Sequence, residues 1–187
     1  RATAAAIAAP GDGPGAAIEI DDRFALPQGM GAAYEIFGES TWGLLGYGFI
    51  YTNKESISIG TGALLQDLIE SGRNVNDMLD RFKKHPAIAP LIAGGETIEY
   101  AAHLIPEGGF NAVPQVYGDG WMIVGDSGGF VNAVHREGSN LAMTTGRLAA
   151  ETVIAAKAAG QPLNARTLKA YKARLDDSFV MKDLHKY

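Results

Sequence analysis

The sequence predicts an α+β fold in which an antiparallel β-sheet is flanked by helices. Residues 32–65 alternate apolar and polar side chains or run through aromatic and β-branched ones, which is typical of strands. Residues 139–153 and 164–179 instead carry apolar side chains at helical spacings. The 187 residues are 47% apolar and 20% charged, and this composition predicts one folded domain with a sizeable core.

The composition excludes several classes of protein. The net charge of −5 comes from 16 basic and 21 acidic residues without a basic run, so nucleic-acid binding is not indicated. The absence of Cys excludes disulfides, thiolate metal sites and an iron–sulfur cluster held by this chain alone. No apolar run reaches the ~18 residues that a transmembrane helix needs. The 4 His residues lie on separate predicted elements, so we predict no metal site. Without a GxSxG turn or a Cys nucleophile, no catalytic side chain is predicted either.

The order of segments predicts how the chain is organised. Residues 1–15 are Ala-rich and then Gly/Pro-rich, and they predict a linker or lead-in before a single domain over residues 16–187. Within that domain we expect a sheet region over residues 16–120, a strand, turn and helix over residues 121–160, and a carboxyl-terminal helix over residues 161–187.

The sheet region contains three strand patterns, at residues 33–37, 46–52 and 56–61, and the last two are joined by a hairpin turn. Gly46 and Gly48 interrupt the second pattern. Interior glycines in a strand indicate either a bulge or a place where a ligand approaches the backbone closely, and both alternatives stay open.

Helices and a further strand are predicted on both sides of the turn at residues 106–109. Asn76 is expected to cap a helix that ends before Pro86, and a short helix over residues 86–92 and a strand over residues 97–104 follow. The final helix is expected to start at Asn164, to bury one apolar stripe and to fray over its last residues. The stripe consists of Leu168, Tyr171, Leu175 and Phe179, and the fraying tail of residues 181–187.

The stretch around Asp126 carries the main functional signal. Four apolar residues, 121–124, run into Gly125 and Asp126, so a short buried strand is predicted to deliver one carboxylate to its carboxyl end. A helix from about Ser139 would point free backbone N–H groups and the positive end of its dipole at whatever Asp126 faces. A flavin dinucleotide offers hydroxyls to the carboxylate and an anionic edge to the helix. The alternative is that Asp126 only caps a turn or a helix.

A longer pattern extends this signal over residues 125–151. It reads GDSGGFVN, then HREGSNLAM, then TGRLAAE, and it resembles the second flavin motif of the electron-transfer-flavoprotein:quinone oxidoreductase superfamily. Within that superfamily it is most similar to the FixC-type dehydrogenases. The resemblance continues upstream through KHPAIAP at residues 84–90 and PEGG at residues 106–109, so it covers about residues 20–180.

The resemblance implies an FAD-dependent oxidoreductase that passes electrons from an electron-transfer flavoprotein to a quinone or a ferredoxin-like acceptor. It implies that the sheet is joined by the last strand and helix of a Rossmann-like FAD-binding fold. It also implies a cytoplasmic protein, or one bound peripherally at the inner membrane. The implied cofactor-binding residues are Gly108, Gly109, Gly125, Asp126, Gly129, Gly138, Ser139 and Asn140. The implied quinone-side residues are Gly46, Gly48, Phe49 and Tyr51.

No strand followed by GxGxxG opens the chain, although such a flavoprotein would use that turn to hold the pyrophosphate. We therefore expect a fragment, with FAD bound in the full-length parent and bound poorly by the fragment alone. Two alternatives remain open. One is a geranylgeranyl-reductase-like or aromatic-hydroxylase-type flavoenzyme, which would share the Gly-Asp motif, and the other is a non-catalytic folded fragment.

Overall fold

The computed structural model of the protein describes residues 2–8, 23–27 and 29–187. The chain divides into two compact units, Arg1–Leu104 and Ile105–Tyr187, which we call unit 1 and unit 2. The predicted α+β class is confirmed, because the chain combines an antiparallel sheet with helices. The division between the units falls after Leu104, whereas the sequence predicted a single domain whose organisation changes at residue 121.

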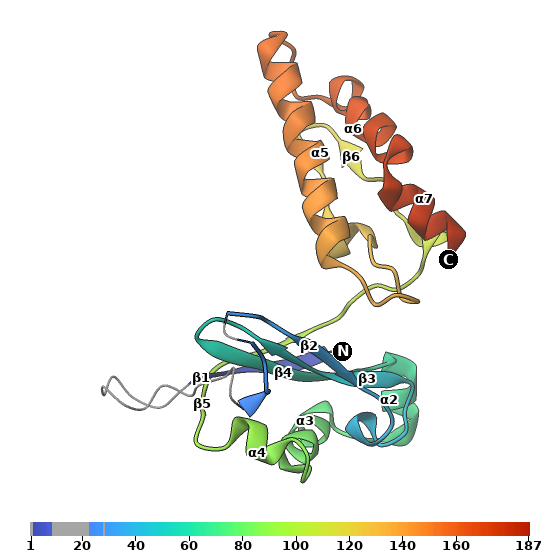
Figure 1. Ribbon diagram of the computed structural model, residues 1–187. Coiled ribbons are helices and arrows are strands. Elements are labelled where there is room, and N and C mark those ends of the chain that lie inside the picture. The colour runs from blue at the N-terminus through green and yellow to red at the C-terminus, as the bar shows by residue number, and fades with distance from the viewer. Residues whose placement is uncertain (1, 9–22, 28) are drawn as a thin grey trace. The chain divides into compact units, whose positions relative to one another are not determined.

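Unit 1 is built on a five-stranded sheet with the strand order β2-β3-β4-β1-β5 (Figure 1). Every pair of neighbouring strands is antiparallel. The predicted strands in this region are confirmed, with ends shifted by one or two residues. The five strands are β1 Ala2–Ala8, β2 Ala33–Ile36, β3 Gly46–Thr52, β4 Ser56–Ala63 and β5 Glu96–His103.

Strand β1 lies where the sequence predicted a linker, so that prediction is wrong for residues 2–8. β1 pairs with β4 on one edge and with β5 on the other. Alanine favours strands only weakly, but two ladders satisfy the backbone N–H and C=O groups on both edges, and this context outweighs propensity. The rest of the predicted linker, residues 9–15, lies outside the described residues.

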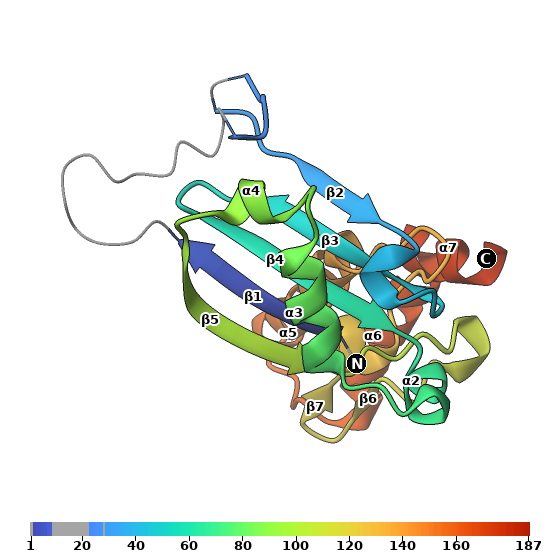
Figure 2. The same ribbon diagram turned by 90° about the horizontal axis from the view of Figure 1, so that it is seen from below.

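Helices cover one face of this sheet and bury its apolar side chains (Figure 2). Ile50 of β3 and Ile57 and Ile59 of β4 pack with Leu79 and Phe82, and all five are at most 3% exposed. Because side chains alternate along a strand, only every second residue of β3 and β4 reaches this core. The helices over this face are α3 Val75–Lys84 and the short α4 Ala89–Ile92. Helix α2 Leu65–Ser71, which the sequence did not predict, instead packs its Leu68 with Val75 and Met78 of α3.

Helix α3 begins two residues earlier than predicted. The capping side chain is that of Asn74, whose Oδ1 accepts a hydrogen bond from the N–H of Asn76 at 2.8 Å. Asn76 itself lies in the first turn, and its own Oδ1 accepts a short hydrogen bond from the hydroxyl of Tyr100. Two asparagines spaced by one residue both suit a cap, and the sequence pattern alone does not choose between them.

Unit 2 packs three helices around a short hairpin (Figure 1). The core of unit 2 contains the fully buried side chains of Val116, Phe130, Leu141, Tyr171 and Leu175. The helices are α5 Ser139–Ala158, α6 Ala165–Asp177 and α7 Phe179–Lys186, and the hairpin is β6 Tyr117–Gly118 with β7 Trp121–Met122. One-turn helices η2 Phe110–Ala112 and η3 Gly125–Gly128 complete the unit, and η1 Glu39–Thr41 lies in unit 1.

Two predictions for unit 2 are wrong. The expected buried strand over residues 121–124 shrinks to the two residues of β7, and Trp121 and Val124 are 43% and 37% exposed. The final helix breaks at Ser178, whose ψ of 164° is extended. The tail then forms α7 instead of fraying, because Val180, Met181 and Leu184 are buried in the core. Phe179, which was expected in the apolar stripe, is 50% exposed.

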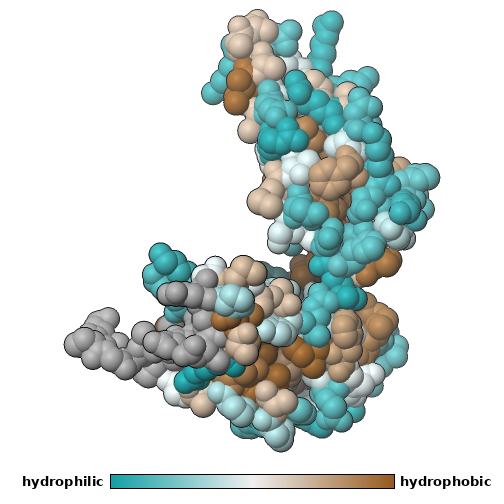
Figure 3. Space-filling view, viewed as in Figure 1, coloured by the Kyte–Doolittle hydropathy of each residue, from teal (hydrophilic) through white to brown (hydrophobic). Residues whose placement is uncertain are grey.

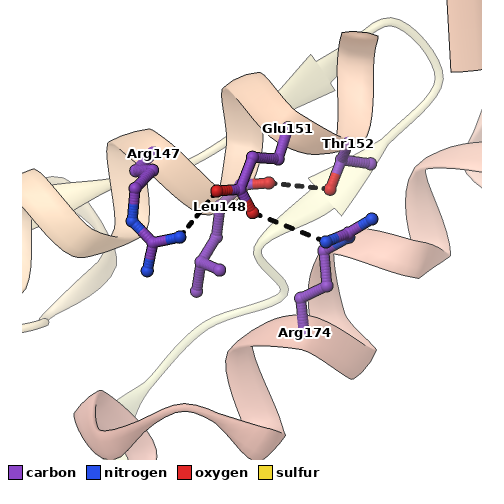
Figure 4. Close-up of polar contacts among 5 residues, drawn as sticks. All are labelled: Arg147, Leu148, Glu151, Thr152 and Arg174. Carbon is purple, nitrogen blue, oxygen red and sulfur yellow. Dashed lines mark hydrogen bonds and ion pairs between the residues drawn. The ribbon is translucent and has the colours of Figure 1, made fainter. Parts of the chain in front are cut away.

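Helices α5 and α6 are also joined by charges on their surface (Figure 4). The carboxylate of Glu151 accepts from Arg147 at 2.6 Å and from Arg174 of α6 at 3.5 Å. On the buried side of the same turn, the hydroxyl of Thr152 donates to the backbone oxygen of Leu148 at 2.8 Å. The N-terminus of α6 is capped by Asn164 as predicted, since its Oδ1 accepts from the N–H of Thr167.

Candidate functional site

The candidate site in unit 2 is the loop of residues 125–138, which we call the Gly-Asp loop. The segment before it is fixed by two hydrogen bonds of Ile123. Its N–H donates to the oxygen of Val116 at 2.9 Å, and its own oxygen accepts from the hydroxyl of Tyr171 at 2.9 Å. The chain therefore enters the loop from a fixed direction, although the strand β7 itself is short.

The first residue of the loop lies against helix α5. Gly125 has a φ of 59°, and a Cβ on it would lie 3.3 Å from the Cβ of Ala142. Its N–H donates to the hydroxyl of Thr145 at 3.0 Å, and that hydroxyl also lies 3.0 Å from the oxygens of Leu141 and Ala142. Thr145 is fully buried. The predicted role of Gly125 thus rests on a left-handed backbone and a close approach, both of which favour glycine.

Asp126 lies at the N-terminus of α5. A Cβ built on Gly138, the N-cap residue of α5, would lie 3.4 Å from Oδ1 of Asp126. The side chain of Asp126 is exposed, and no hydrogen bond joins its carboxylate to the part of the chain that the structure describes. The alternative was that Asp126 only caps a turn or a helix, but neither η3 nor α5 has a side-chain cap hydrogen bond. The carboxylate is free to accept from a ligand.

The first turn of α5 supplies donors next to this carboxylate. Ser139 and Asn140 are the first two helical residues, so their backbone N–H groups have no partner within the helix. The side chain of Asn140 is already engaged, donating to Glu137 at 3.1 Å and accepting from the N–H of Leu141 at 2.9 Å. Any contribution of Asn140 to binding would therefore come from its backbone.

Gly129 serves the turn that follows Asp126. Its φ is 72°, and its N–H donates to the backbone oxygen of Asp126 at 2.8 Å. Gly128, which was not among the predicted cofactor-binding residues, is required by packing, since a Cβ there would lie 2.4 Å from the ring of Phe130. These two glycines shape the loop through its backbone, and neither offers a side chain to a ligand.

The turn at residues 106–109 belongs to the same unit. Gly109 has a φ of 68° and begins η2, and a Cβ on Gly108 would lie 2.4 Å from the Cβ of Ala112. The two glycines are thus explained by a tight turn. Residues 106–108 are exposed, which leaves the turn accessible to a ligand.

The predicted quinone-side residues lie in unit 1, on both faces of β3. Gly48 faces the covered side, where a Cβ would lie 2.7 Å from Ser40 and 2.9 Å from the ring of Phe82. A Cβ on Gly46 would overlap the backbone of Gly62. Strand alternation places Phe49 and Tyr51 on the opposite face. The structure therefore groups the two aromatic residues together and separates them from the two glycines.

The aromatic face of β3 is a row of three rings. The rings of Phe49 and Tyr51 are stacked at 4.7 Å with an interplanar angle of 22°, and Tyr47 lies 6.3 Å from Phe49. Gly60 of β4 stands opposite Phe49 in the register, and Gly62 stands opposite Tyr47. A row of rings beside a row without side chains forms a flat surface that suits a planar ligand.

Two residues of the site were missed as functional candidates, although the sequence motif contains both. Thr145 anchors Gly125, and Asn132 organises the second half of the loop through its buried side chain. A threonine inside a helix does not by itself indicate a functional role. The role of Thr145 depends on its hydrogen bond to Gly125, which lies 20 residues away in the sequence.

No group of three or more His, Asp or Glu side chains within residues 2–8, 23–27 and 29–187 is arranged to hold a metal ion. Over the same residues, no helix combines the length and apolarity that crossing a bilayer requires.

Comparison with known proteins shows what the chain is similar to. It is 54% identical over 168 residues to Protein FixC of Bradyrhizobium diazoefficiens and 59% identical over 156 residues to Protein FixC of Azotobacter vinelandii. It is 45% identical over 171 residues to YdiS of Escherichia coli, named a probable electron transfer flavoprotein-quinone oxidoreductase. These matches take in 90%, 83% and 90% of this chain but 39%, 36% and 40% of the relatives. No protein-family model matches the chain.

Solved structures show the same fold at low sequence identity. A geranylgeranyl bacteriochlorophyll reductase-like protein from Thermoplasma acidophilum matches with a TM-score of 0.61 and 16% identity, covering 94% of this chain and 38% of that one. A triple mutant of the flavin-dependent brominase Bmp2 matches with a TM-score of 0.54 and 21% identity, covering 94% and 40%. These structures show the fold alone, whereas the relatives with 45–59% identity confirm the predicted resemblance for the segment that the chain spans.

Proposed function

We propose that this chain, a member of the FixC and electron transfer flavoprotein-quinone oxidoreductase family, forms the flavin- and quinone-side part of an FAD-dependent oxidoreductase. The proposed reaction passes electrons from an electron-transfer flavoprotein to a quinone or a ferredoxin-like acceptor. One observation carries the proposal: a carboxylate without a partner in the described chain stands at the uncapped N-terminus of a 20-residue helix. The chain spans about two fifths of the length of its relatives.

The residues around Asp126 fit a flavin. The carboxylate of Asp126 would accept from ribityl or ribose hydroxyls, and the N–H groups of Ser139 and Asn140 would face the N1 and O2 edge of the ring. Gly138 has no Cβ, so that edge can approach the helix. When bound, flavin supplies the electron-transfer chemistry. The chain's own donors would favour negative charge at that edge and so raise the reduction potential.

The turn at residues 106–109 would offer backbone groups to the same ring. The exposure of residues 106–108 and the tight turn at Gly108 and Gly109 support this role. Gly129 would contribute by shaping the turn after Asp126. None of these positions requires an acid or base, because electron transfer through a bound cofactor needs positioning and electrostatics more than proton transfer by side chains.

The aromatic face of β3 would hold the quinone. The stacked rings of Phe49 and Tyr51 and the neighbouring row of Gly60 and Gly62 support this, because a quinone head group is planar. Gly46 and Gly48 would act indirectly, by letting β3 lie close to β4 and to Phe82. Since quinones reside in membranes, the proposed acceptor would bring the protein to a membrane surface.

Spectroscopy and steady-state kinetics of the purified full-length protein test the proposal. We expect a yellow protein with flavin absorbance and quinone-dependent oxidation of reduced electron-transfer flavoprotein. A flavin-containing protein that reduces an isoprenoid or hydroxylates an aromatic compound instead would support the geranylgeranyl-reductase or hydroxylase alternative. A colourless protein that takes up no added flavin would leave the chain as a non-catalytic module.

A further inference from the structure

We propose that the last turn of α7 holds the Gly-Asp loop in its ligand-ready conformation, with Asp183 as the positioning residue. The inference rests on the proposed flavin site and adds a part of the chain that lies 32 or more residues beyond the end of the flavin motif at Glu151. The helix that was expected to fray would thus decide how well Asp126 and the N-terminus of α5 are placed.

Asn132 organises the second half of the loop. It is 2% exposed, and its backbone N–H and oxygen pair with Glu137 at 2.8 and 3.1 Å. Its Oδ1 accepts from the N–H groups of Val134 and His135, both at 3.0 Å. The pairing with Glu137 ends one residue before Gly138, the N-cap of α5. The conformation of Asn132 therefore decides where the helix N-terminus begins.

The amide nitrogen of Asn132 makes its hydrogen bond to α7. Nδ2 donates to Oδ2 of Asp183 at 2.5 Å, across 51 residues of sequence. A charged acceptor on a buried amide is among the stronger hydrogen bonds in proteins, and removing it leaves the Nδ2 donor buried without a partner. Asp183 thereby fixes the side chain whose other end holds Val134 and His135.

Two ring contacts place the same turn of α7 between both predicted flavin-contacting segments. His135 of the loop meets Tyr187 edge-on at 4.5 Å, and Phe110, directly after the turn at residues 106–109, meets His185 edge-on at 4.8 Å. Edge-to-face pairs of this kind are favourable but modest. They show that α7 contacts both segments, while the hydrogen bond from Asn132 supplies the directional contact.

Helix α7 can serve as a brace because its opposite side is anchored. Val180, Met181 and Leu184 are at most 6% exposed and pack in the core with Leu141 and Tyr171. Asp183 is half-buried between this core and the loop. A loop that is tied to an anchored helix keeps its conformation without ligand, so the ordering cost on binding is smaller.

The test compares Asp183→Ala with two controls in the full-length protein. Asp183→Asn keeps an oxygen that can accept from Asn132, and Asp177→Ala removes an exposed carboxylate from the end of α6 that has no side-chain contact within the described chain. The first readout is amide hydrogen exchange of residues 128–138 in the flavin-free protein. The second is the dissociation constant for FAD, measured by quenching of flavin fluorescence.

For Asp183→Ala we expect exchange of the Val134, His135 and Glu137 amides to rise about tenfold or more, and the FAD dissociation constant to rise by a similar factor. Exchange in the core around Tyr171 should stay unchanged. Asp183→Asn should recover most of both effects, and Asp177→Ala should resemble the wild type. If Asp183→Ala does not fold, Tyr187→Ala should still raise exchange at His135 by a smaller factor.

Unchanged loop exchange in Asp183→Ala, or in Tyr187→Ala where that variant replaces it, would overturn the brace. Faster exchange with an unchanged FAD dissociation constant would overturn the link between the brace and binding. A wild-type protein that binds no FAD would contradict the proposed function, while the exchange measurement would still decide whether α7 holds the loop.

Discussion

One fully buried threonine in each unit differs in how its hydroxyl group is paired. Thr61 of β4 and Thr145 of α5 are both fully buried. The hydroxyl of Thr145 bonds to Gly125 and to its own helix, whereas that of Thr61 has no hydrogen-bond partner among the residues that the structure describes. A buried polar group is costly unless it is paired, so the paired hydroxyl indicates a selected geometry and the unpaired one does not.

Both units expose apolar side chains, but they differ in how they use polar contacts. Unit 1 exposes large apolar side chains, with Ile98 and Tyr100 on β5 62% and 53% exposed, and its surface shows apolar patches in the view of Figure 3. Unit 2 also exposes large apolar side chains, with Met143 and Ile154 of α5 71% and 67% exposed, but it uses side-chain hydrogen bonds to shape a loop. Sheet packing thus forms the first unit, and polar contacts to backbone form the candidate site of the second.

The largest effect is expected for Thr145→Val. The valine fills the same volume but leaves the buried N–H of Gly125 without an acceptor, which should cost about 1–3 kcal/mol of unfolding free energy. Urea denaturation measures the loss. Thr145→Ser keeps the hydroxyl and should lose much less, so equal stability of the valine and serine variants would break the contrast between the units.

Tyr171→Phe should cost about 1 kcal/mol at neutral pH, because it removes the hydrogen bond to the oxygen of Ile123. Burial raises the pKa of Tyr171 from 10.0 to about 12. The folded state therefore holds this proton more tightly than the unfolded state. The stability that the protonated Tyr171 contributes to the folded state is fully present below pH 10 and is lost as the pH rises from 10 to 12.

Denaturation of the wild type and of Tyr171→Phe between pH 8 and about pH 12 tests the predicted loss of stability at alkaline pH. The wild type should lose stability in this range as the phenol of Tyr171 ionises, and the Phe variant should not, because it has no phenol. The two free energies of unfolding should therefore converge and then cross. Parallel curves over the whole range would show that Tyr171 titrates normally.

Thr61→Val should have the opposite sign to Thr145→Val. Replacing an unpaired buried hydroxyl with a methyl group removes a desolvation cost, so we expect a gain of up to about 1 kcal/mol. Thermal unfolding of the variant beside Thr61→Ala, which leaves a small cavity, separates the two effects. A destabilised valine variant would mean that the hydroxyl of Thr61 is paired in solution.

The smallest effect is expected for Glu151→Ala. Its ion pairs with Arg147 and Arg174 lie at 2.6 and 3.5 Å, but the three side chains are 39–61% exposed. Solvent screens such pairs, so the loss should stay below about 1 kcal/mol and shrink as salt is added. Denaturation at low and high salt checks this, and a loss that does not depend on salt would indicate packing instead.

Local pattern was sufficient for most of the fold. Period-two alternation predicted β2 and β4, and aromatic and β-branched content predicted β3. The stripe of Leu168, Tyr171 and Leu175 predicted α6. β1 was missed because alanine carries little strand signal and its pairing partners lie about 50 to 100 residues away. α7 was missed because a helix of eight residues with one exposed aromatic has a weak pattern until its core is known.

The candidate site divides in the same way. Gly125, Asp126 and Gly138 were predicted from a contiguous motif, and the structure brings them together at the start of α5. The groups that hold them could not be predicted, because the contact from Asn132 to Asp183 spans 51 residues. The alternation of side chains along β3 places its aromatic residues on one face of the sheet and Gly46 and Gly48 on the other, and the sequence prediction grouped them together.

The central claim is that the carboxylate of Asp126 and the start of α5 bind a flavin. Titration of the flavin-free full-length protein with FAD tests it directly, comparing the wild type with Asp126→Ala and, as a control, Asp177→Ala. Loss of one charge-assisted hydrogen bond should weaken FAD binding by about 1.5–3 kcal/mol, or roughly ten- to a hundredfold, with the control unchanged. An Asp126→Ala protein that folds normally and binds FAD as tightly as the wild type would contradict the claim.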